Sequence, residues 1–155
     1  MEVIQTKIHK LLIKNKKTIA IAESCTGGQL SNLLTQISGS SRYFILGIVA
    51  YSNKAKIAIL KIPARLIAEK GAVSKDVATA MAKSVRKIAR TDLGIGITGI
   101  AGPAGATEGK PIGTVFIAVD GPLKKLCKEF HFRGKRLTIR RKAASKCLEL
   151  LRGML

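Results

Sequence analysis

Apolar residues recur along the chain in two patterns, one typical of amphipathic helices and one of buried strands. Helical spacing occurs in residues 3–14, from Leu30 to Ile37, from Ser74 to Arg90, and after Gly134. Lys54–Leu60 is predicted to be a shorter helix, and Ile62–Gly71 a connector. Five apolar runs of strand length lie between these segments, at Thr18–Ala22, Tyr43–Tyr51, Asp92–Ile97, Ile112–Val119 and Leu126–Phe132.

The alternation of strands and helices predicts an α/β fold, with a mostly parallel or mixed sheet covered by helices. No repeat or linker divides the chain, so residues 1–155 are expected to form a single domain. Ligands of such folds gather beyond the carboxyl ends of the strands. We therefore expect the turns after Ala22, Tyr51 and Ile97 to converge on one site.

The segment Gly39–Lys56 is the strongest candidate for carrying that site. Its apolar middle predicts a buried strand, with small hydroxyl residues before it and Tyr51, Asn53 and Lys56 after it. Reactive groups at both ends of one apolar run suit a site better than they suit a structural strand.

Two further segments follow buried strands directly. Glu23–Gly28 is a small-residue turn that leads into a helix, which favours either anion binding at the helix start or ordinary capping by Ser24 or Thr26. Thr98–Pro111 is a long loop rich in glycine and proline, and loops of this length in compact domains are often functional.

Composition excludes several classes of protein. No apolar run reaches the ~18 residues of a membrane span, and the charged N-terminal segment does not fit a signal peptide, so a cytoplasmic protein is expected. The cysteines Cys25, Cys127 and Cys147 and the histidines His9 and His131 lack metal-ligand spacing. Neither a metal site nor a disulfide framework is expected.

The charge is strongly positive, with 28 Lys and Arg against 9 Asp and Glu, or +19. Such a chain attracts polyanions without a dedicated site. A non-catalytic basic module that binds nucleic acid or nucleotides is therefore an alternative function. The basic residues are spread over every segment, and aromatic residues for base stacking are only 4% of the chain, which favours a general compositional bias.

Five motifs in order resemble the CinA C-terminal domain family, whose stand-alone members are nicotinamide-nucleotide amidases. They are Glu23–Gly28, Tyr51–Lys56, Gly71–Ser74, Thr98–Pro103 and Lys110–Val115, and the likeness runs from about residue 3 to residue 153. The resemblance implies an α/β sandwich, often a homodimer. It also implies hydrolysis of nicotinamide mononucleotide (NMN) to nicotinic acid mononucleotide and ammonia in pyridine nucleotide recycling, without metal or cofactor.

Residue by residue, the resemblance implies Ser41 as nucleophile, with Tyr51 and Lys56 as its catalytic partners and Arg140 as the basic residue of the last helix. Substrate binding is implied around the Thr-Gly-Gly turn and the loop after Thr98. The chain departs from the family pattern at Leu46, where a second glycine is usual, and at Lys135, where an acidic residue is common. The implied substrate-binding residues are Ser24, Thr26, Gly27, Gly28, Asn53, Thr98, Gly99, Gly102 and Arg140.

A serine needs a base to attack an amide, and neither histidine lies in a motif. Lys56 can serve if burial or nearby positive charge lowers its pKa, with Tyr51 relaying the proton or holding the amine. Ser24 and Cys25 are competing nucleophiles. A straight strand of nine residues spans about 30 Å, so Ser41 meets Lys56 only if the strand is shorter, the chain folds back, or a second copy supplies one end.

Overall fold

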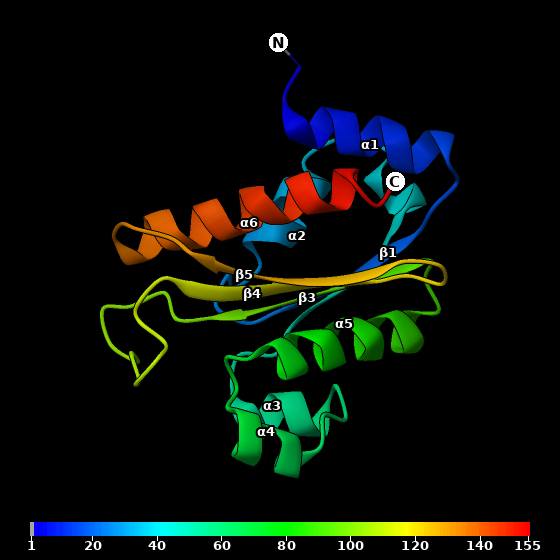
Figure 1. Cartoon of the computed structure of the whole chain (residues 1–155). Coiled ribbons are helices and arrows are strands. Elements are labelled where there is room, and N and C mark those ends of the chain that lie inside the picture. Colours follow the sequence, from blue (N-terminus) through cyan, green and yellow to red (C-terminus); the bar gives the residue numbers. More distant parts are fainter. Residues whose placement is uncertain (1) are drawn as a thin grey trace.

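The computed structural model describes residues 2–155, and at its centre lies a five-stranded sheet with helices on both faces (Figure 1). The strand order is β2-β1-β3-β4-β5. The strands are β1 (Ile19–Glu23), β2 (Phe44–Val49), β3 (Leu93–Gly99), β4 (Thr114–Asp120) and β5 (Lys125–His131). The helices are α1 (Ile4–Lys14), α2 (Gln29–Thr35), α3 (Asn53–Ala58), α4 (Ala64–Lys70), α5 (Lys75–Ala89) and α6 (Arg136–Arg152), with a 3-10 turn, η1, at Ser40–Arg42.

The sheet is mixed, which confirms the predicted fold class. β1 pairs in parallel with β2 and β3, whereas β4 and β5 continue the sheet in antiparallel fashion. Glu23 lies level with both Val49 and Ile97. The carboxyl ends of three parallel strands therefore meet at one edge of the sheet, as the sequence predicted.

Two layers of helices cover the sheet. In Figure 1, α1, α2 and α6 lie on one face, and α3, α4 and α5 on the other. The first face buries a large apolar cluster around Ile21, Ile95 and Leu148, and the second buries a smaller cluster around Met81 and Val85. None of the helices between residues 2 and 155 combines the length and the apolar character that crossing a membrane requires.

Two glycines allow α5 to approach β3 closely. A Cβ on Gly94 would lie 2.1 Å from the carbonyl oxygen of Ala82, and one on Gly96 would lie 2.3 Å from that of Ala78. The backbone of α5 therefore rests directly on the strand. Ser74 begins the helix by accepting a hydrogen bond from the Val77 N–H at 3.2 Å.

Three local predictions were wrong. The run Tyr43–Tyr51 forms a six-residue edge strand rather than a buried one. Among residues 2–155, β2 pairs only with β1, and its Ile45 and Val49 are about half exposed. The connector Ile62–Gly71 contains α4. Ile88, which lies at helical spacing between Ser74 and Arg90 and was therefore expected to be buried, is 48% exposed.

The substitution Gly96→Ala tests the contact between α5 and β3. We expect it to lower the free energy of unfolding by roughly 1–3 kcal/mol, because the added methyl must displace backbone atoms. Urea denaturation measures the change. Gly153→Ala is the matched control, since its Cβ would meet its nearest atom at 3.4 Å, and an equal loss in both variants would contradict the close contact.

Candidate functional site

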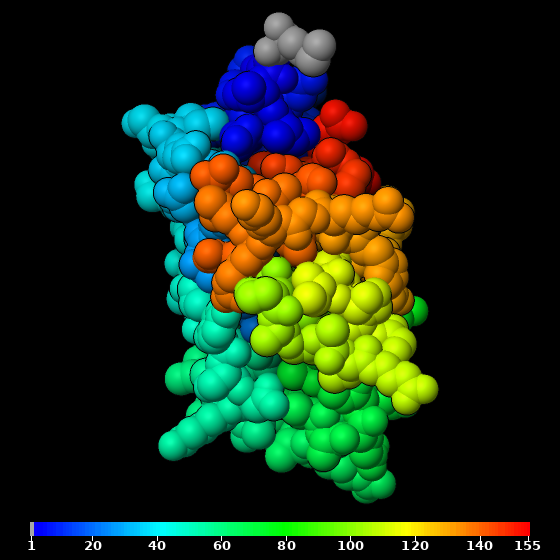
Figure 2. All heavy atoms as spheres, turned by 90° about the vertical axis from the view of Figure 1, so that its left-hand side faces the viewer, coloured from blue at the N-terminus to red at the C-terminus, as the bar shows by residue number. Residues whose placement is uncertain are grey.

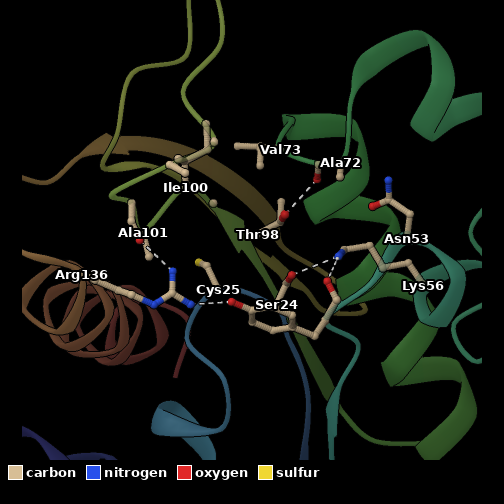
Figure 3. Close-up of a pocket in the computed structure, with 15 residues that line it drawn as sticks. Ser24, Cys25, Asn53, Lys56, Ala72, Val73, Thr98, Ile100, Ala101 and Arg136 are labelled. Carbon is tan, nitrogen blue, oxygen red and sulfur yellow. Dashed lines mark hydrogen bonds between the residues drawn. The ribbon is translucent and has the colours of Figure 1, made fainter.

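A cavity of about 290 Å³ opens where the three parallel strands end. Figure 2 faces this end of the molecule, where the yellow-green loop after β3 lies between the orange start of α6 and the green and teal helices. Figure 3 shows the lining side chains. These residues are Ser24, Cys25, Tyr51, Asn53, Lys56, Ala72, Val73, Thr98, Gly99, Ile100, Ala101, Gly102, Ala104, Gly105 and Arg136.

The side chain of Lys56 extends from α3 into the cavity and is almost completely buried. Its Nζ donates to Ser24 Oγ at 3.0 Å and to the backbone carbonyl of Tyr51 at 3.1 Å (Figure 3). No carboxylate lines the cavity to compensate the charge. Burial therefore lowers the pKa of the Lys56 amine below its ordinary value.

The turn that carries Ser24 is fixed by the buried carboxylate of Glu23. Its oxygens accept hydrogen bonds from the N–H groups of Gly28, Leu30 and Ser31 at 3.1, 3.2 and 2.8 Å, and from Ser31 Oγ at 2.7 Å. The anion at the start of α2 is thus part of the protein itself. The N–H groups considered for a substrate phosphate already have an acceptor.

The guanidinium of Arg140 holds the same turn from α6. It donates to the carbonyls of Cys25 and Thr26 at 3.1 and 3.0 Å, and it does not line the cavity. Gly27 lies against it in a left-handed conformation, where a Cβ would be 2.6 Å from the Arg140 Nη2 atom. Thr26, Gly27, Gly28 and Arg140 therefore shape the turn rather than face the cavity.

Arg136, one helical turn before Arg140, is the guanidinium that lines the cavity. It donates to the carbonyl of Gly102 at 2.8 Å and to Tyr51 Oη at 2.6 Å. It forms no ion pair with any acidic residue in the part of the chain that the structure describes. Arg136 and Arg140 are four residues apart on α6, and this spacing does not tell which of them faces the cavity.

The remaining predicted residues divide between the cavity and its surroundings. Tyr51 contacts Lys56 through its carbonyl, while its half-exposed phenol contacts Arg136. Asn53, Thr98, Gly99 and Gly102 line the cavity, and Thr98 Oγ1 donates to the Ala72 carbonyl at 2.8 Å. Ala72 and Val73 also line the cavity, and their sequence showed no sign of this beyond belonging to the motif Gly71–Ser74.

Ser41 lies away from this cavity. It belongs to the exposed turn η1 before β2, whereas the cavity follows β2. The six residues of β2 span roughly 20 Å. Although the strand is shorter than predicted, the chain does not fold back, and Ser41 does not meet Lys56 within one chain.

Cys25 lines the cavity beside Ser24, but its thiol is poorly suited to attack. Burial raises the pKa of Cys25 to about 12, so the thiolate is scarce near neutral pH. Between residues 2 and 155, no three His, Cys, Asp or Glu side chains cluster as metal ligands would.

The cavity also offers a free hydrogen-bond donor. The backbone N–H of Cys25, which lines the cavity, donates to no backbone or side-chain oxygen among residues 2–155. An N–H directly after a nucleophilic residue is a common donor to the oxyanion in acyl transfer. A hydroxyl, a buried amine, a free N–H group and an arginine thus surround one cavity.

Comparison with known proteins places the chain in a family. Residues 1–155 match the family model of the CinA C-terminal domain. CinA-like proteins of Geobacter sulfurreducens and Koribacter versatilis are 45% and 50% identical to it, over 96% and 87% of the chain. The chain spans about a third of their length, 36% and 33%.

Solved structures agree with this match. A competence-damaged protein (CinA) superfamily protein of Escherichia coli superimposes with a TM-score of 0.94 at 31% identity, covering 98% of this chain and 88% of that one. A competence or damage-inducible protein of Enterobacter asburiae gives 0.93 at 33% identity, covering 98% and 96%. The chain therefore belongs to the CinA C-terminal domain family.

Proposed function

We propose that the chain is an amidohydrolase that converts NMN to nicotinic acid mononucleotide and ammonia, with Ser24 as nucleophile and Lys56 as base. The contact between Ser24 Oγ and Lys56 Nζ is the observation that carries this proposal. It replaces Ser41 by the competing serine of the Glu23–Gly28 motif, because Ser24 contacts the buried amine whereas Ser41 lies away from the cavity. Family membership supports the reaction class.

The neutral amine of Lys56 accepts the Ser24 proton while one of its own N–H groups stays on the Tyr51 carbonyl. Ser24 Oγ then bonds to the carboxamide carbon, and the carbonyl oxygen becomes an oxyanion. The free N–H of Cys25 can stabilise that charge, at roughly 3 kcal/mol for a well-placed donor.

The protonated Lys56 next donates its extra proton to the amide nitrogen as the C–N bond breaks, which releases ammonia. The remaining ester on Ser24 is attacked by water, whose proton passes to Lys56. Collapse of this second intermediate breaks the bond to Ser24 Oγ, returns the proton to it and releases the carboxylate product.

Arg136 supports an anionic substrate. It is a cation at the cavity wall whose only hydrogen bonds in the described residues go to neutral oxygens, those of Gly102 and Tyr51. A phosphate can replace them with charge-assisted, bidentate bonds. We therefore assign the substrate phosphate to Arg136 rather than to Arg140 or to the Thr-Gly-Gly turn.

Serine substitutions test the nucleophile. Ser24→Ala is expected to lower ammonia release from NMN by about 10³-fold or more, because the attacking oxygen is lost, whereas Ser41→Ala stays within about twofold of the unmodified protein. Thermal unfolding of both variants serves as the control for folding. The opposite result, an inactive Ser41→Ala and an active Ser24→Ala, would mean that a second copy of the chain brings Ser41 to the cavity.

The pH dependence tests Lys56. Because the amine acts as base only when neutral, kcat/KM is expected to rise about tenfold per pH unit and to level off below 10.5, the ordinary lysine value. The plateau begins at a lower pH than for an ordinary lysine because burial lowers the pKa of the Lys56 amine. Lys56→Arg should be inactive across the range, since a guanidinium does not deprotonate. A value of kcat/KM that does not change with pH would exclude Lys56 as the base.

The phosphate assignment is tested with two substrates. Arg136→Gln should lower kcat/KM for NMN by roughly 10- to 100-fold, the value of a charge-assisted contact, and change that for nicotinamide riboside, which lacks the phosphate, by less than about threefold. Arg133→Gln, an exposed arginine outside the cavity, is the matched control. Equal losses on both substrates would show that Arg136 acts by holding Tyr51 and the Gly102 loop.

A further inference from the structure

A second, strongly basic groove lies at the opposite end of the sheet. It runs between the C-terminal half of α5 and the start of β5 and has a volume of about 500 Å³. Five cations line it, together with one carboxylate. These residues, called here the α5 groove, are Lys83, Arg86, Lys87, Arg90, Lys125 and Asp120.

The single carboxylate is already engaged. Asp120 is buried, and its oxygens lie 2.9 Å from Arg86 Nη1 and 3.3 Å from Lys125 Nζ. The other three cations, Lys83, Lys87 and Arg90, are exposed and form no ion pair with any acid among residues 2–155. The groove therefore keeps a local excess of positive charge.

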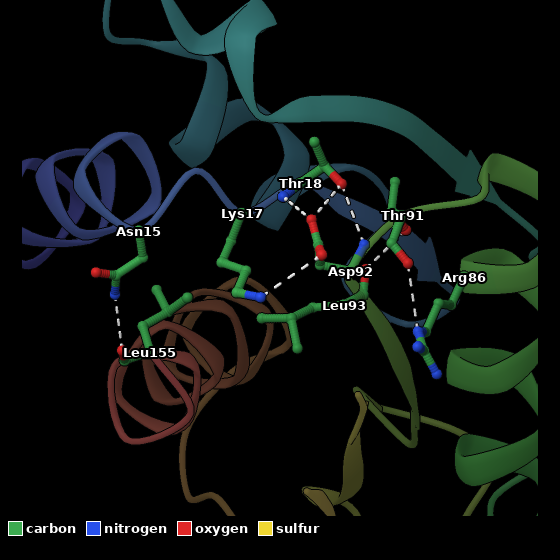
Figure 4. Close-up of polar contacts among 8 residues, drawn as sticks. All are labelled: Asn15, Lys17, Thr18, Arg86, Thr91, Asp92, Leu93 and Leu155. Carbon is green, nitrogen blue, oxygen red and sulfur yellow. Dashed lines mark hydrogen bonds and ion pairs between the residues drawn. The ribbon is translucent and has the colours of Figure 1, made fainter. Parts of the chain in front are cut away.

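The floor of the groove is held in place by hydrogen bonds. Arg86 Nε donates to the Thr91 carbonyl at 3.3 Å, and Thr91 Oγ1 donates to the Leu93 carbonyl at 2.9 Å (Figure 4). The neighbouring carboxylate of Asp92 does not offset the cations, because it accepts hydrogen bonds from the N–H and hydroxyl of Thr18 and lies 3.7 Å from Lys17 Nζ.

Helix stability alone does not account for this concentration of charge. Cations near a helix C-terminus interact favourably with the macrodipole, but the dipole amounts to only about half an elementary charge. Lys83 and Lys87 lie one turn apart on α5 and Arg90 directly follows its last residue, so the three cations are spread over roughly 10 Å along the helix. A row of this length can contact several phosphates of a duplex, which carries one charge per ~1.7 Å.

We propose that the α5 groove binds the phosphodiester backbone of a nucleic-acid duplex without sequence preference. No aromatic side chain lines the groove to stack on bases, so the contacts are electrostatic. The groove is separate from the cavity that contains Ser24, because Thr91 precedes β3 whereas the cavity lies at the end of β3, and the seven residues of this strand span roughly 23 Å. Both sites can be occupied together.

The test compares two triple variants that remove equal charge. The groove variant combines Lys83→Gln, Lys87→Gln and Arg90→Gln, and so removes the three unpaired cations of the groove. The scattered variant removes three exposed cations of α1, β5 and α6 that form no ion pair with an acid among residues 2–155. It combines Lys14→Gln, Lys128→Gln and Arg141→Gln. Fluorescence anisotropy with a labelled DNA duplex of about 20 base pairs, from about 50 to 300 mM KCl, gives the affinity and its salt dependence. Thermal unfolding confirms that both variants fold.

We expect the groove variant to bind at least about 10-fold more weakly, with a log–log salt slope shallower by about 2–3, and the scattered variant to change the slope by less than about 1. Equal weakening in both variants would assign the binding to overall charge and overturn the proposal. So would an unmodified chain that does not bind at low salt. Heparin binding that falls equally with DNA binding in the groove variant would also overturn it, by showing a general polyanion site.

Discussion

The site depends on one buried carboxylate. Glu23 ends β1 and accepts hydrogen bonds from three N–H groups and one hydroxyl at the start of α2. Hydrogen bonds to a charged group contribute about 1.5–3 kcal/mol each, so they hold the turn firmly. Arg140 fixes the turn from the other side through two carbonyls. Ser24, between these anchors, is presented to Lys56 with little freedom.

This arrangement also explains why the turn does not need an external anion. A short helix preceded by small residues resembles a phosphate site. The sequence alone was compatible both with phosphate binding and with ordinary helix capping. The structure favours capping. The capping group is unusual because it is Glu23, the last residue of β1. The positive charge toward a substrate comes instead from Arg136 at the cavity wall. One guanidinium of α6 supports the turn, and the other remains open to a ligand.

The two ends of the sheet are chemically different. One end gathers Ser24, Lys56 and Arg136 around a cavity suited to a small anionic amide. The other concentrates five cations in an open groove at the end of α5. The overall charge of +19 gives a diffuse attraction for polyanions, however the charges are distributed over the surface. In the groove, by contrast, five cations lie close together around Arg86 and Thr91, whose positions are fixed by hydrogen bonds. This local clustering of charge distinguishes the groove from the rest of the basic surface.

The sequence by itself determined the alternation of strands and helices and the convergence of three turns, because the periodicity of apolar residues acts locally. It also identified the motifs that contain Ser24, Tyr51 and Lys56. Only the tertiary structure decided which serine meets the lysine and which arginine faces the cavity. These choices depend on register: β1 and β2 run parallel with Glu23 level with Val49, so Ser24 lies at the same edge as Lys56 and Ser41 at the other. The sequence likewise did not predict that β2 lies at the edge of the sheet, since an apolar run has the same pattern whether one or two strands pair with it.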